Sequence, residues 1–346
     1  GVGRPVMLVG GAGTGKTTIL QDFLAHLESN SWMQYNIAMN FYTDSKSLQA
    51  QLENPIDKRS GHTFGPPSGR KLVYFVDDLN LPYVETYGTQ NSLSLMRQLI
   101  DHGNFFDRID LGFRTKVVDV QFVTAMNPTA GSFTISDRLQ RQFSTFACMM
   151  PSQSDLRTIY HSILDGHLEA FEPRISGLTS ALVDSTVNIT KSVQSSFLPS
   201  AIKFTYNWNM RELSNVVQGL CRADPGSYTE PLDMVRLWYH ECNRVFKDRM
   251  VAALDLSRFE EQLLDVGKKF FSEVKIGTGM NDIIEIKAEE LVAEPCVYTS
   301  FVSPSHGEPT YLPIPSQEVF VECVKGKLVE YNESNSIMDL VLFQAA

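Results

Sequence analysis

The sequence predicts an α/β fold in which helices cover both faces of a parallel sheet, followed by a smaller helical domain. Apolar strand-like runs alternate with helical patterns through residues 1–150, which is typical of a parallel sheet with helical crossovers. A glycine-rich turn, Gly10–Gly15, joins the first apolar run to the first helical pattern. From about Gln153 onward the strand signal fades and helical patterns dominate. These observations place the sheet in the first part of the chain and the helical domain after it.

Apolar runs within residues 1–150 predict strands at Val6–Val9, Ile37–Phe41, Leu72–Val76, Val117–Ala125 and Ser144–Met149. Helical patterns between these runs predict helices at Lys16–Leu27, Ser45–Glu53 and Gln90–Asp101. A segment rich in Gly, Pro and basic residues, Lys58–Arg70, predicts a loop before the third strand.

Helical periodicity predicts the smaller domain from Asp155–Asp165, Ile175–Phe197, Met210–Cys221 and Asp233–Ala253. Residues Gly277–Pro315 mix short strand-like runs with prolines and predict no clear element. We therefore expect a large α/β domain over 1–150, a small helical domain over 151–255 and a C-terminal extension over 256–346. Because the chain opens almost directly on a strand and closes on Met338–Phe343, which resembles the start of another element, we expect both ends to be cuts within a longer polypeptide.

The composition is that of a soluble globular protein, with 43% hydrophobic and 20% charged residues and a formal net charge of −10. Nucleic-acid binding depends on clustered Lys and Arg, and no basic block here is longer than a pair such as Lys268-Lys269. No apolar run approaches the roughly 18 residues that span a bilayer. We therefore expect no nucleic acid and no membrane among the partners. The 5 cysteines form no CxxC pair, so neither a disulfide framework nor a zinc site is indicated.

The glycine-rich turn matches the phosphate-binding pattern G-x-x-x-x-G-K-[ST] in full, between an apolar strand and a helical pattern. The nucleotide-binding residues are predicted to be Gly10, Gly11, Ala12, Gly13, Thr14, Gly15, Lys16, Thr17 and Thr18. Glycines let successive backbone N–H groups face the phosphates, and the following helix adds its positive N-terminal end. Lys16 is expected to reach the β- and γ-phosphates, and the Thr17 hydroxyl to bind Mg²⁺. We therefore expect ATP or ADP and Mg²⁺ as cofactors.

An apolar run that ends in two carboxylates, Leu72–Asp78, fits the second half of such a site. Asp77 is predicted to hold the metal, and Asp78 to orient and activate the attacking water. Most enzymes of this kind have Glu at the second position. Asp is shorter by about 1.5 Å, and a misplacement of about 1 Å can cost on the order of 10²-fold in rate. Nucleotide binding is therefore predicted more firmly than efficient hydrolysis. The alternative is that both acids are solvated residues at a strand end.

Three later segments are similar, in order, to segments of AAA+ ATPases: Val120–Met126 followed by Asn127-Pro128, Asp137–Phe143, and Trp208–Ser214. The resemblance implies that Asn127 is the sensor-one residue near the γ-phosphate. It also implies that Arg138 or Arg141 is the arginine finger for a neighbouring module, and that Arg211 is the sensor-two arginine. Taken singly, an Asn-Pro after a strand is usually a turn, and arginines on a polar helix are mostly solvated. The two candidate fingers lie three residues apart, so they are expected to share a helix face, and the sequence does not choose between them.

Longer stretches resemble dynein heavy chains: Phe75–Pro82 with Glu85–Gln90, Ala125–Pro128 with Gly131–Thr134, Asn209–Leu213, and Arg236–Glu241 with Arg244–Arg249. These stretches cover most of residues 1–250. The Asp77-Asp78 pair and the Gly65-Pro66-Pro67 loop are most similar to the third AAA+ module of an axonemal, outer-arm dynein. The ending, Tyr331–Gln344, resembles the lead-in to the fourth module.

The resemblance implies a regulatory module of a microtubule motor ring that binds ATP or ADP, hydrolyses ATP slowly and gates coupling to the microtubule-binding stalk. The implied partners are neighbouring AAA+ modules of the same heavy chain, with microtubules engaged only through the full motor. The implied location is the cytoplasm and cytoskeleton, in the axoneme of a cilium or flagellum. Because the finger for this site must come from the following module, we expect the isolated chain to be a slow or inactive ATPase. The alternative is a stand-alone homo-oligomeric AAA+ ATPase, such as a loader or unfoldase.

Overall fold

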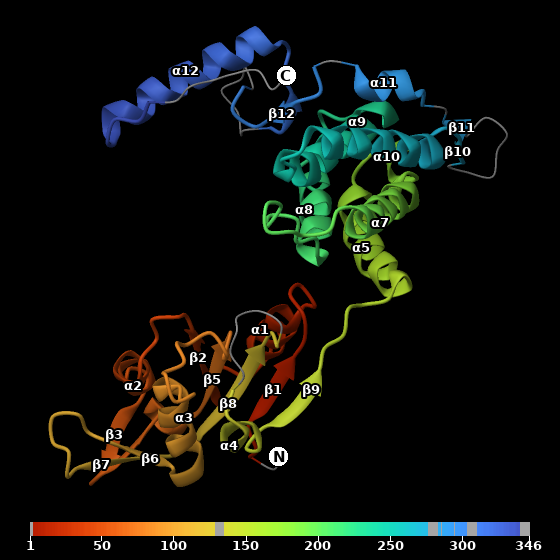
Figure 1. The fold of residues 1–346 in the computed structure, drawn as a ribbon. Helices are drawn as coiled ribbons and strands as arrows, with labels where there is room; N and C mark the ends of the chain where they lie inside the picture. Colours follow the sequence, from red (N-terminus) through yellow and green to blue (C-terminus); the bar gives the residue numbers. More distant parts are fainter. Residues whose placement is uncertain are drawn as a thin grey trace. The chain divides into compact units, whose positions relative to one another are not determined.

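The computed structural model describes residues 3–128, 135–275, 283–284, 286–293, 295–302 and 310–339. The chain divides into two compact units, Gly1–Met150 and Pro151–Ala346. Figure 1 shows the helices and strands of each unit. The described residues of the first unit form two buried hydrophobic clusters, and those of the second unit form one.

The first unit is built on a parallel sheet of five strands in the order β2 (Trp32–Ala38), β5 (Lys71–Asp77), β8 (Val120–Met126), β1 (Val6–Val9) and β9 (Ser144–Ala147). Every pairing in this sheet is parallel. The carboxyl ends of β1, β5 and β8 therefore meet at one edge, where the residues that follow each strand come together.

Helices cover both faces of this sheet, as the side chains of β5 show. Its alternate residues Leu72, Tyr74 and Val76 enter a core with α2 (Ser45–Glu53) and α3 (Asn91–His102). Val73 and Phe75 enter the core on the other face, with α1 (Lys16–Ala25). This alternation is the period of two that a strand buried on both faces requires. The predicted fold class, a parallel sheet covered by helices with a smaller helical domain, is confirmed.

A second sheet, which the sequence did not predict, is attached to the first unit. Its order is β3 (Asp57–Ser60), β4 (Thr63–Gly65), β7 (Arg114–Val117) and β6 (Asn104–Phe106). The prediction of a loop over Lys58–Arg70 is wrong for the first half of that segment, because β3 and β4 form an antiparallel pair there. All four residues of β3 are exposed, so no apolar alternation marks the strand.

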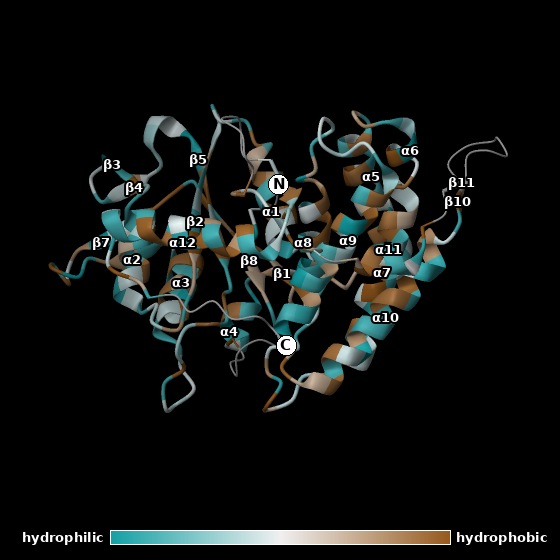
Figure 2. Cartoon of the chain, turned by 90° about the horizontal axis from the view of Figure 1, so that it is seen from above, coloured by the Kyte–Doolittle hydropathy of each residue, from teal (hydrophilic) through white to brown (hydrophobic). Residues whose placement is uncertain are grey.

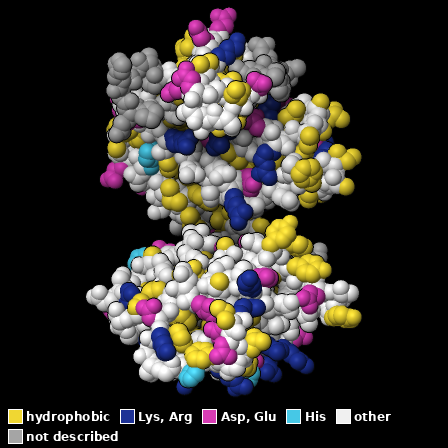
Figure 3. Space-filling view, turned by 90° about the vertical axis from the view of Figure 1, so that its left-hand side faces the viewer, with side chains coloured by type: hydrophobic (Ala, Val, Ile, Leu, Met, Phe, Trp, Pro, Cys, Tyr) yellow, Lys and Arg dark blue, Asp and Glu magenta, His cyan; other side chains and the backbone are white. Residues whose placement is uncertain are grey.

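Figure 3 shows Lys and Arg side chains gathered at the lower end of this unit, within a chain that is acidic overall.

Two predicted strands have different bounds in the structure. The predicted strand Val117–Ala125 is divided between β7 and β8, because Asp119 takes a left-handed backbone conformation with φ 57°. The predicted strand Ile37–Phe41 lies earlier, as β2, where Trp32 pairs with Lys71 and Ala38 with Asp77. The first unit also contains a 3₁₀ turn at Pro67–Gly69 and the short helix α4 (Asp137–Gln140).

The second unit is mainly helical, and its helices carry stripes of hydrophobic and hydrophilic residues (Figure 2). They are α5 (Gln153–Leu168), α6 (Pro173–Ser176), α7 (Thr179–Ser196), α8 (Met210–Leu220), α9 (Pro231–Phe246), the 3₁₀ turn η2 (Lys247–Arg249), α10 (Ala253–Phe271), α11 (Ala288–Val292) and α12 (Gln317–Ser334). The predicted helix Ile175–Phe197 is divided at Gly177, which caps α6. The predicted helix Asp233–Ala253 ends earlier, at Phe246, where η2 begins.

The core of the second unit continues past the boundary that the sequence suggested at 255/256. That position lies inside α10, whose Phe259 and Leu263 are buried in the same core as Trp238 of α9. Tyr298 and Tyr311 also belong to this core. Tyr298 begins β12 (Tyr298–Thr299), and Tyr311 directly precedes its antiparallel partner β13 (Leu312–Pro313). A second short pair joins β10 (Val274–Lys275) to β11 (Ile283–Ile284).

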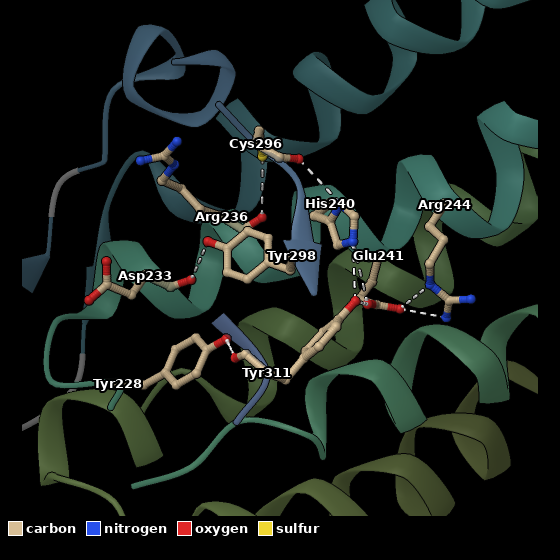
Figure 4. A network of polar contacts seen from close by, with 9 residues as sticks. All are labelled: Tyr228, Asp233, Arg236, His240, Glu241, Arg244, Cys296, Tyr298 and Tyr311. Atoms are coloured by element: carbon tan, nitrogen blue, oxygen red, sulfur yellow. Dashed lines mark hydrogen bonds and ion pairs between the residues drawn. The ribbon is translucent and has the colours of Figure 1, made fainter. Parts of the chain in front are cut away.

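A buried polar cluster ties the β12–β13 segment to α9 (Figure 4). Glu241 has no exposed surface, and its carboxylate accepts hydrogen bonds from Arg244 at 2.6 and 2.9 Å and from the Tyr311 hydroxyl at 2.6 Å. His240 lies 3.2 Å from both the Tyr311 hydroxyl and the Cys296 carbonyl oxygen. Desolvation lowers the pKa of His240 from its ordinary value. The carboxylate is thus paired on both oxygens, as a buried charge must be.

None of the helices within the described ranges is both long enough and apolar enough to span a bilayer.

Candidate nucleotide site

The glycine-rich turn lies at the carboxyl end of β1 and leads directly into α1, the context that the motif requires (Figure 1). Gly13 and Gly15 have φ values of 74° and 80°, in the left-handed region that favours glycine. Gly10 faces a different constraint, because a Cβ there would lie 2.2 Å from the backbone oxygen of Cys148. No side chain caps α1 at Gly15, and the positive N-terminal end of the helix faces the turn where an anion is expected.

Lys16 is held over the turn. Its side chain is 9% exposed, and the ammonium donates hydrogen bonds to the carbonyl oxygens of Gly10 at 3.0 Å and Gly11 at 2.7 Å. The Thr14 hydroxyl donates to the Gly11 carbonyl oxygen at 3.2 Å, which closes the turn. A cation is therefore placed beside the backbone groups that are expected to bind phosphate.

The predicted metal ligands lie together although 60 residues separate them in the sequence. The Thr17 hydroxyl donates a hydrogen bond to Asp77 Oδ2 at 3.0 Å. Thr17 is at the start of α1, and Asp77 ends β5, two strands away from β1. One hydroxyl and one carboxylate oxygen at this distance suit Mg²⁺, which prefers hard oxygen ligands and completes its shell with phosphate and water. Within the described part of the chain, no group of three or more His, Cys, Asp or Glu could hold a metal ion by itself.

Asp78 has a left-handed backbone conformation, with φ 53°. Asp and Asn are several-fold enriched in this region, because their short side chains tolerate it better than longer ones do. Its backbone N–H donates to Asp77 Oδ1 at 3.0 Å, so the turn also orients the predicted metal ligand. The local backbone therefore gives a physical reason for Asp at the position where Glu is usual.

Asn127 follows β8, the strand between β5 and β1, and is 8% exposed. The structure therefore brings the predicted sensor to the same sheet edge as Asp77 and the glycine-rich turn. Asn80 was not predicted as a site residue, yet it is 1% exposed and its side-chain amide donates a hydrogen bond to the Asn127 carbonyl oxygen at 3.0 Å. Asn80 thus joins the segment after β5 to the segment after β8. Two signals in the sequence could have found it: an amide between Leu79 and Leu81, and its place in the Phe75–Pro82 stretch that resembles dynein.

The two candidate finger arginines lie in the segment that precedes β9, and not beside the glycine-rich turn. Arg138 lies in α4, and Arg141 is the C-cap of that helix. The Arg141 carbonyl oxygen accepts a hydrogen bond from Arg4 at 3.0 Å, just before β1 begins. The 4 residues of β1, about 13 Å, separate this point from the turn. Arg141 therefore lies at the amino-terminal end of the strands, whereas this chain's own phosphate cradle lies at their carboxyl-terminal end. Arg138 is exposed beside α3, where it lines a cavity with Arg97.

Arg211 is exposed on the first turn of α8, in the second unit, so its approach to a nucleotide stays a prediction. The Asn209 side chain caps this helix by accepting a hydrogen bond from the Arg211 backbone N–H at 2.8 Å. Thr18 is exposed on α1. The Gly131–Thr134 stretch that resembles dynein, and most of the ending after Met338, lie outside the described residues.

Comparison with known proteins decides the family. A family profile described as "P-loop containing dynein motor region" matches residues 2–151. A profile described as "AAA+ lid domain" matches residues 182–279. The chain belongs to the dynein motor-region family. Its first unit is a dynein P-loop AAA+ domain, and its second unit carries the AAA+ lid, which confirms the family resemblance found in the sequence.

Individual dyneins align with nearly the whole chain. The dynein beta chain of the flagellar outer arm of Chlamydomonas reinhardtii is 42% identical over 343 residues, 98% of this chain. The ciliary dynein beta chain of Tripneustes gratilla is 43% identical over 346 residues, 99% of this chain. Dynein axonemal heavy chain 9 of Homo sapiens is 38% identical over 345 residues, 99% of this chain. The chain spans 7% of the length of each of these relatives.

Proposed function

We propose that this chain is a regulatory nucleotide-binding module of an axonemal dynein motor ring. It binds ATP or ADP with Mg²⁺, hydrolyses ATP slowly and gates the coupling of the motor. The hydrogen bond between Thr17 and Asp77 carries the proposal, because it joins the phosphate cradle to a metal-binding carboxylate at one sheet edge. A chance glycine-rich turn would have no reason to face an acid 60 residues away.

Each residue at the edge has a role in this proposal. Lys16 would offset the charge of the β- and γ-phosphates, and Thr17 and Asp77 would hold Mg²⁺, which would supply further positive charge beside the phosphates. Asp78 would orient the attacking water, and Asn127, after the neighbouring strand β8, would sense the γ-phosphate. Because Asp78 is shorter than Glu and its backbone is left-handed, we propose that it positions water poorly and that turnover is slow.

Completion of the site requires another module. Arg141 lies at the opposite edge of the sheet from the cradle, so it serves a neighbour's nucleotide and not its own. A missing finger typically costs about 10³–10⁵ in rate. The relatives are long heavy chains of which this chain matches 7%, which favours neighbouring AAA+ modules in the same polypeptide over a stand-alone homo-oligomer.

The names of the relatives support a more specific assignment. They are flagellar, ciliary and axonemal chains, so we propose the axoneme of a cilium or flagellum as the location, with microtubules engaged through the full motor. The Asp77-Asp78 pair and the Gly65-Pro66-Pro67 loop support the third module of the ring.

Calorimetric titration with ATP and ADP, with and without Mg²⁺, tests the proposal. Lys16→Ala removes the ammonium that Gly10 and Gly11 hold over the turn, and we expect it to abolish nucleotide binding. Unchanged affinity in this variant would refute the cradle. Affinity that does not depend on Mg²⁺ would refute the roles of Thr17 and Asp77.

A further inference from the structure

A cavity of about 350 Å³ opens at the surface of the first unit, away from the candidate nucleotide site. It is lined by the segment Phe41–Asp44 after β2, by part of the loop between β5 and α3, and by the first turn of α3. In the sheet, β5 and β8 lie between β2 and β1, so three strand spacings, about 14 Å, separate β2 from the strand that carries the cradle. No residue of the glycine-rich turn lines this cavity.

Three aromatic side chains that line the cavity are exposed: Phe41 by 47%, Tyr42 by 87% and Tyr83 by 52%. The Phe41 ring meets the other two rings edge to face, with ring centres 5.3 Å apart in both pairs. The Tyr83 backbone N–H donates to the Phe41 carbonyl oxygen at 3.1 Å and so joins the two segments. Large apolar side chains that are exposed together, rather than singly, mark a binding surface.

Two carboxylates line the same cavity. Asp44 caps α2 and accepts a hydrogen bond from the Ser47 backbone N–H at 2.7 Å, and the hydrogen bonds from Ser47 lower the pKa of Asp44 from its ordinary value. Glu85 accepts hydrogen bonds from the Thr89 hydroxyl at 3.0 Å and from a side-chain amide of α3. Neither carboxylate forms an ion pair with another residue in the described ranges, and Arg108 acts on Asp44 only at longer range. Their negative charge is therefore open to a cation.

A buried hydroxyl also lines the cavity. Ser92 is 1% exposed, and its Oγ has no hydrogen-bond partner among the described residues. A serine on a helix often donates to the carbonyl four residues earlier, but Ser92 is in the first turn of α3, where that carbonyl lies outside the helix. Because a buried polar group without a partner lowers stability, its presence here points to a ligand that donates to it.

We infer that this cavity is a binding site for an arginine side chain of a peptide segment outside this chain. A guanidinium is a planar cation that stacks on aromatic rings and offers five donors, so it complements exposed rings, two carboxylates and a hydroxyl together. A lysine ammonium carries the charge but lacks the plane and the fixed fork of donors. A cavity of about 350 Å³ is near the lower limit of ligand pockets, about 300–1,000 Å³, which suits a single side chain.

Saturation-transfer NMR of the 346-residue chain with the peptide acetyl-Gly-Arg-Gly-amide tests the inference. The arginine peptide should bind with a Kd on the order of 1 mM. The same peptide with citrulline, which has nearly the same shape and no charge, should bind at least about 10-fold more weakly. The peptide with lysine should bind about 3- to 10-fold more weakly. A citrulline or lysine peptide that binds as tightly as the arginine peptide would overturn the inference.

Variants of the cavity locate the binding. Glu85→Gln removes one of the two charges and should weaken the arginine peptide about 5- to 10-fold. Tyr42→Ala removes an exposed ring and should weaken it about 3-fold. Glu28→Gln and Tyr87→Ala are the matched controls, because they remove an exposed acid and an exposed aromatic of the first unit that do not line the cavity. Each control should change the affinity less than about 2-fold. Cavity variants that match their controls would refute the site.

Ser92→Ala separates a ligand-binding hydroxyl from a structural one. It should weaken the arginine peptide about 2- to 5-fold, while the urea midpoint of the free chain stays unchanged or rises, since the unpaired hydroxyl stabilises nothing there. A lower midpoint with unchanged peptide affinity would contradict this role. Should Glu85→Gln fail to fold, Tyr42→Ala still decides the matter, because its side chain is 87% exposed. The inference does not rest on nucleotide binding, so its failure would leave the proposed function untouched.

Discussion

Replacing Gly219 with alanine tests the buried cluster that ties the β12–β13 segment to the lid. Gly219 is on α8, and an added Cβ would lie 2.0 Å from Glu241 Oε2 and 2.1 Å from its carboxyl carbon. Atoms this close repel strongly, so Glu241 has to move. It has no exposed surface to move into, and its oxygens already bind Arg244 and Tyr311.

The expected loss follows from these contacts. Breaking a buried ion pair so that one charge is left unpaired costs about 3–5 kcal/mol. Alanine regains about 1 kcal/mol through its higher helix propensity. Gly219→Ala should therefore lower the free energy of unfolding of the second unit by about 2–4 kcal/mol. Gly166→Ala is the control, because a Cβ at this α5 position meets no atom within 4 Å. It should raise the stability by about 0.5–1 kcal/mol.

Urea unfolding followed by tryptophan fluorescence measures both effects. In a Trp32→Phe background the remaining tryptophans, Trp208 and Trp238, are both in the second unit. If the clash is the cause, Gly219→Ala should cost much less when Glu241 is also replaced by Ala. A Gly219→Ala chain as stable as the parent would refute the account of this cluster.

Three further predictions concern the sheet edge and the lid. Gly10→Ala places a Cβ 2.2 Å from the Cys148 backbone oxygen, which cannot rotate away, so calorimetry should show ADP affinity reduced at least about 10-fold; parent-like affinity would contradict the cradle geometry. Asp78→Asn keeps a residue that tolerates φ 53° and removes the charge, so the chain should retain ATP and, with the following module present to supply its finger, turn it over more slowly; unchanged turnover in a single-turnover assay would make Asp78 a structural acid. The pKa of His240 is lowered below 6.5 in the folded lid, so the unfolded chain binds more protons as the pH falls below that value. Urea midpoints between about pH 7 and about pH 5 should therefore fall more steeply for the parent than for His240→Gln, and equal slopes would argue against the shift.

The part of the site that is local in sequence was predictable. Strand, glycine-rich turn and helix follow one another within Val6–Ala25, so one motif defines the cradle. Asp77 was predictable because an apolar run ends there. The pairing of Thr17 with Asp77 then follows from parallel strands that meet at one edge.

Features built from distant or exposed residues were not predictable. The strand β3 is exposed at every residue, so periodicity gives no signal for it. None of the residues of α12 is buried, so the helix has no apolar stripe from which it could have been predicted. In the sequence, Glu241 and Arg244 look like an ordinary surface pair on α9. In the structure the carboxylate packs against Gly219 of α8 and accepts a hydrogen bond from the Tyr311 hydroxyl, 70 residues later, and neither contact can be read from the sequence.

Single-turnover hydrolysis of ATP with Mg²⁺, combined with a count of the nucleotide retained by the purified chain, tests the central claim most directly. The account predicts retained nucleotide and a rate near background for the isolated chain. It predicts a rate higher by up to about 10³–10⁵-fold when the following module of the same heavy chain is present and supplies its finger. Brisk multiple turnover by the isolated chain, together with homo-oligomers in sizing experiments, would contradict the account and favour a self-assembling AAA+ ATPase.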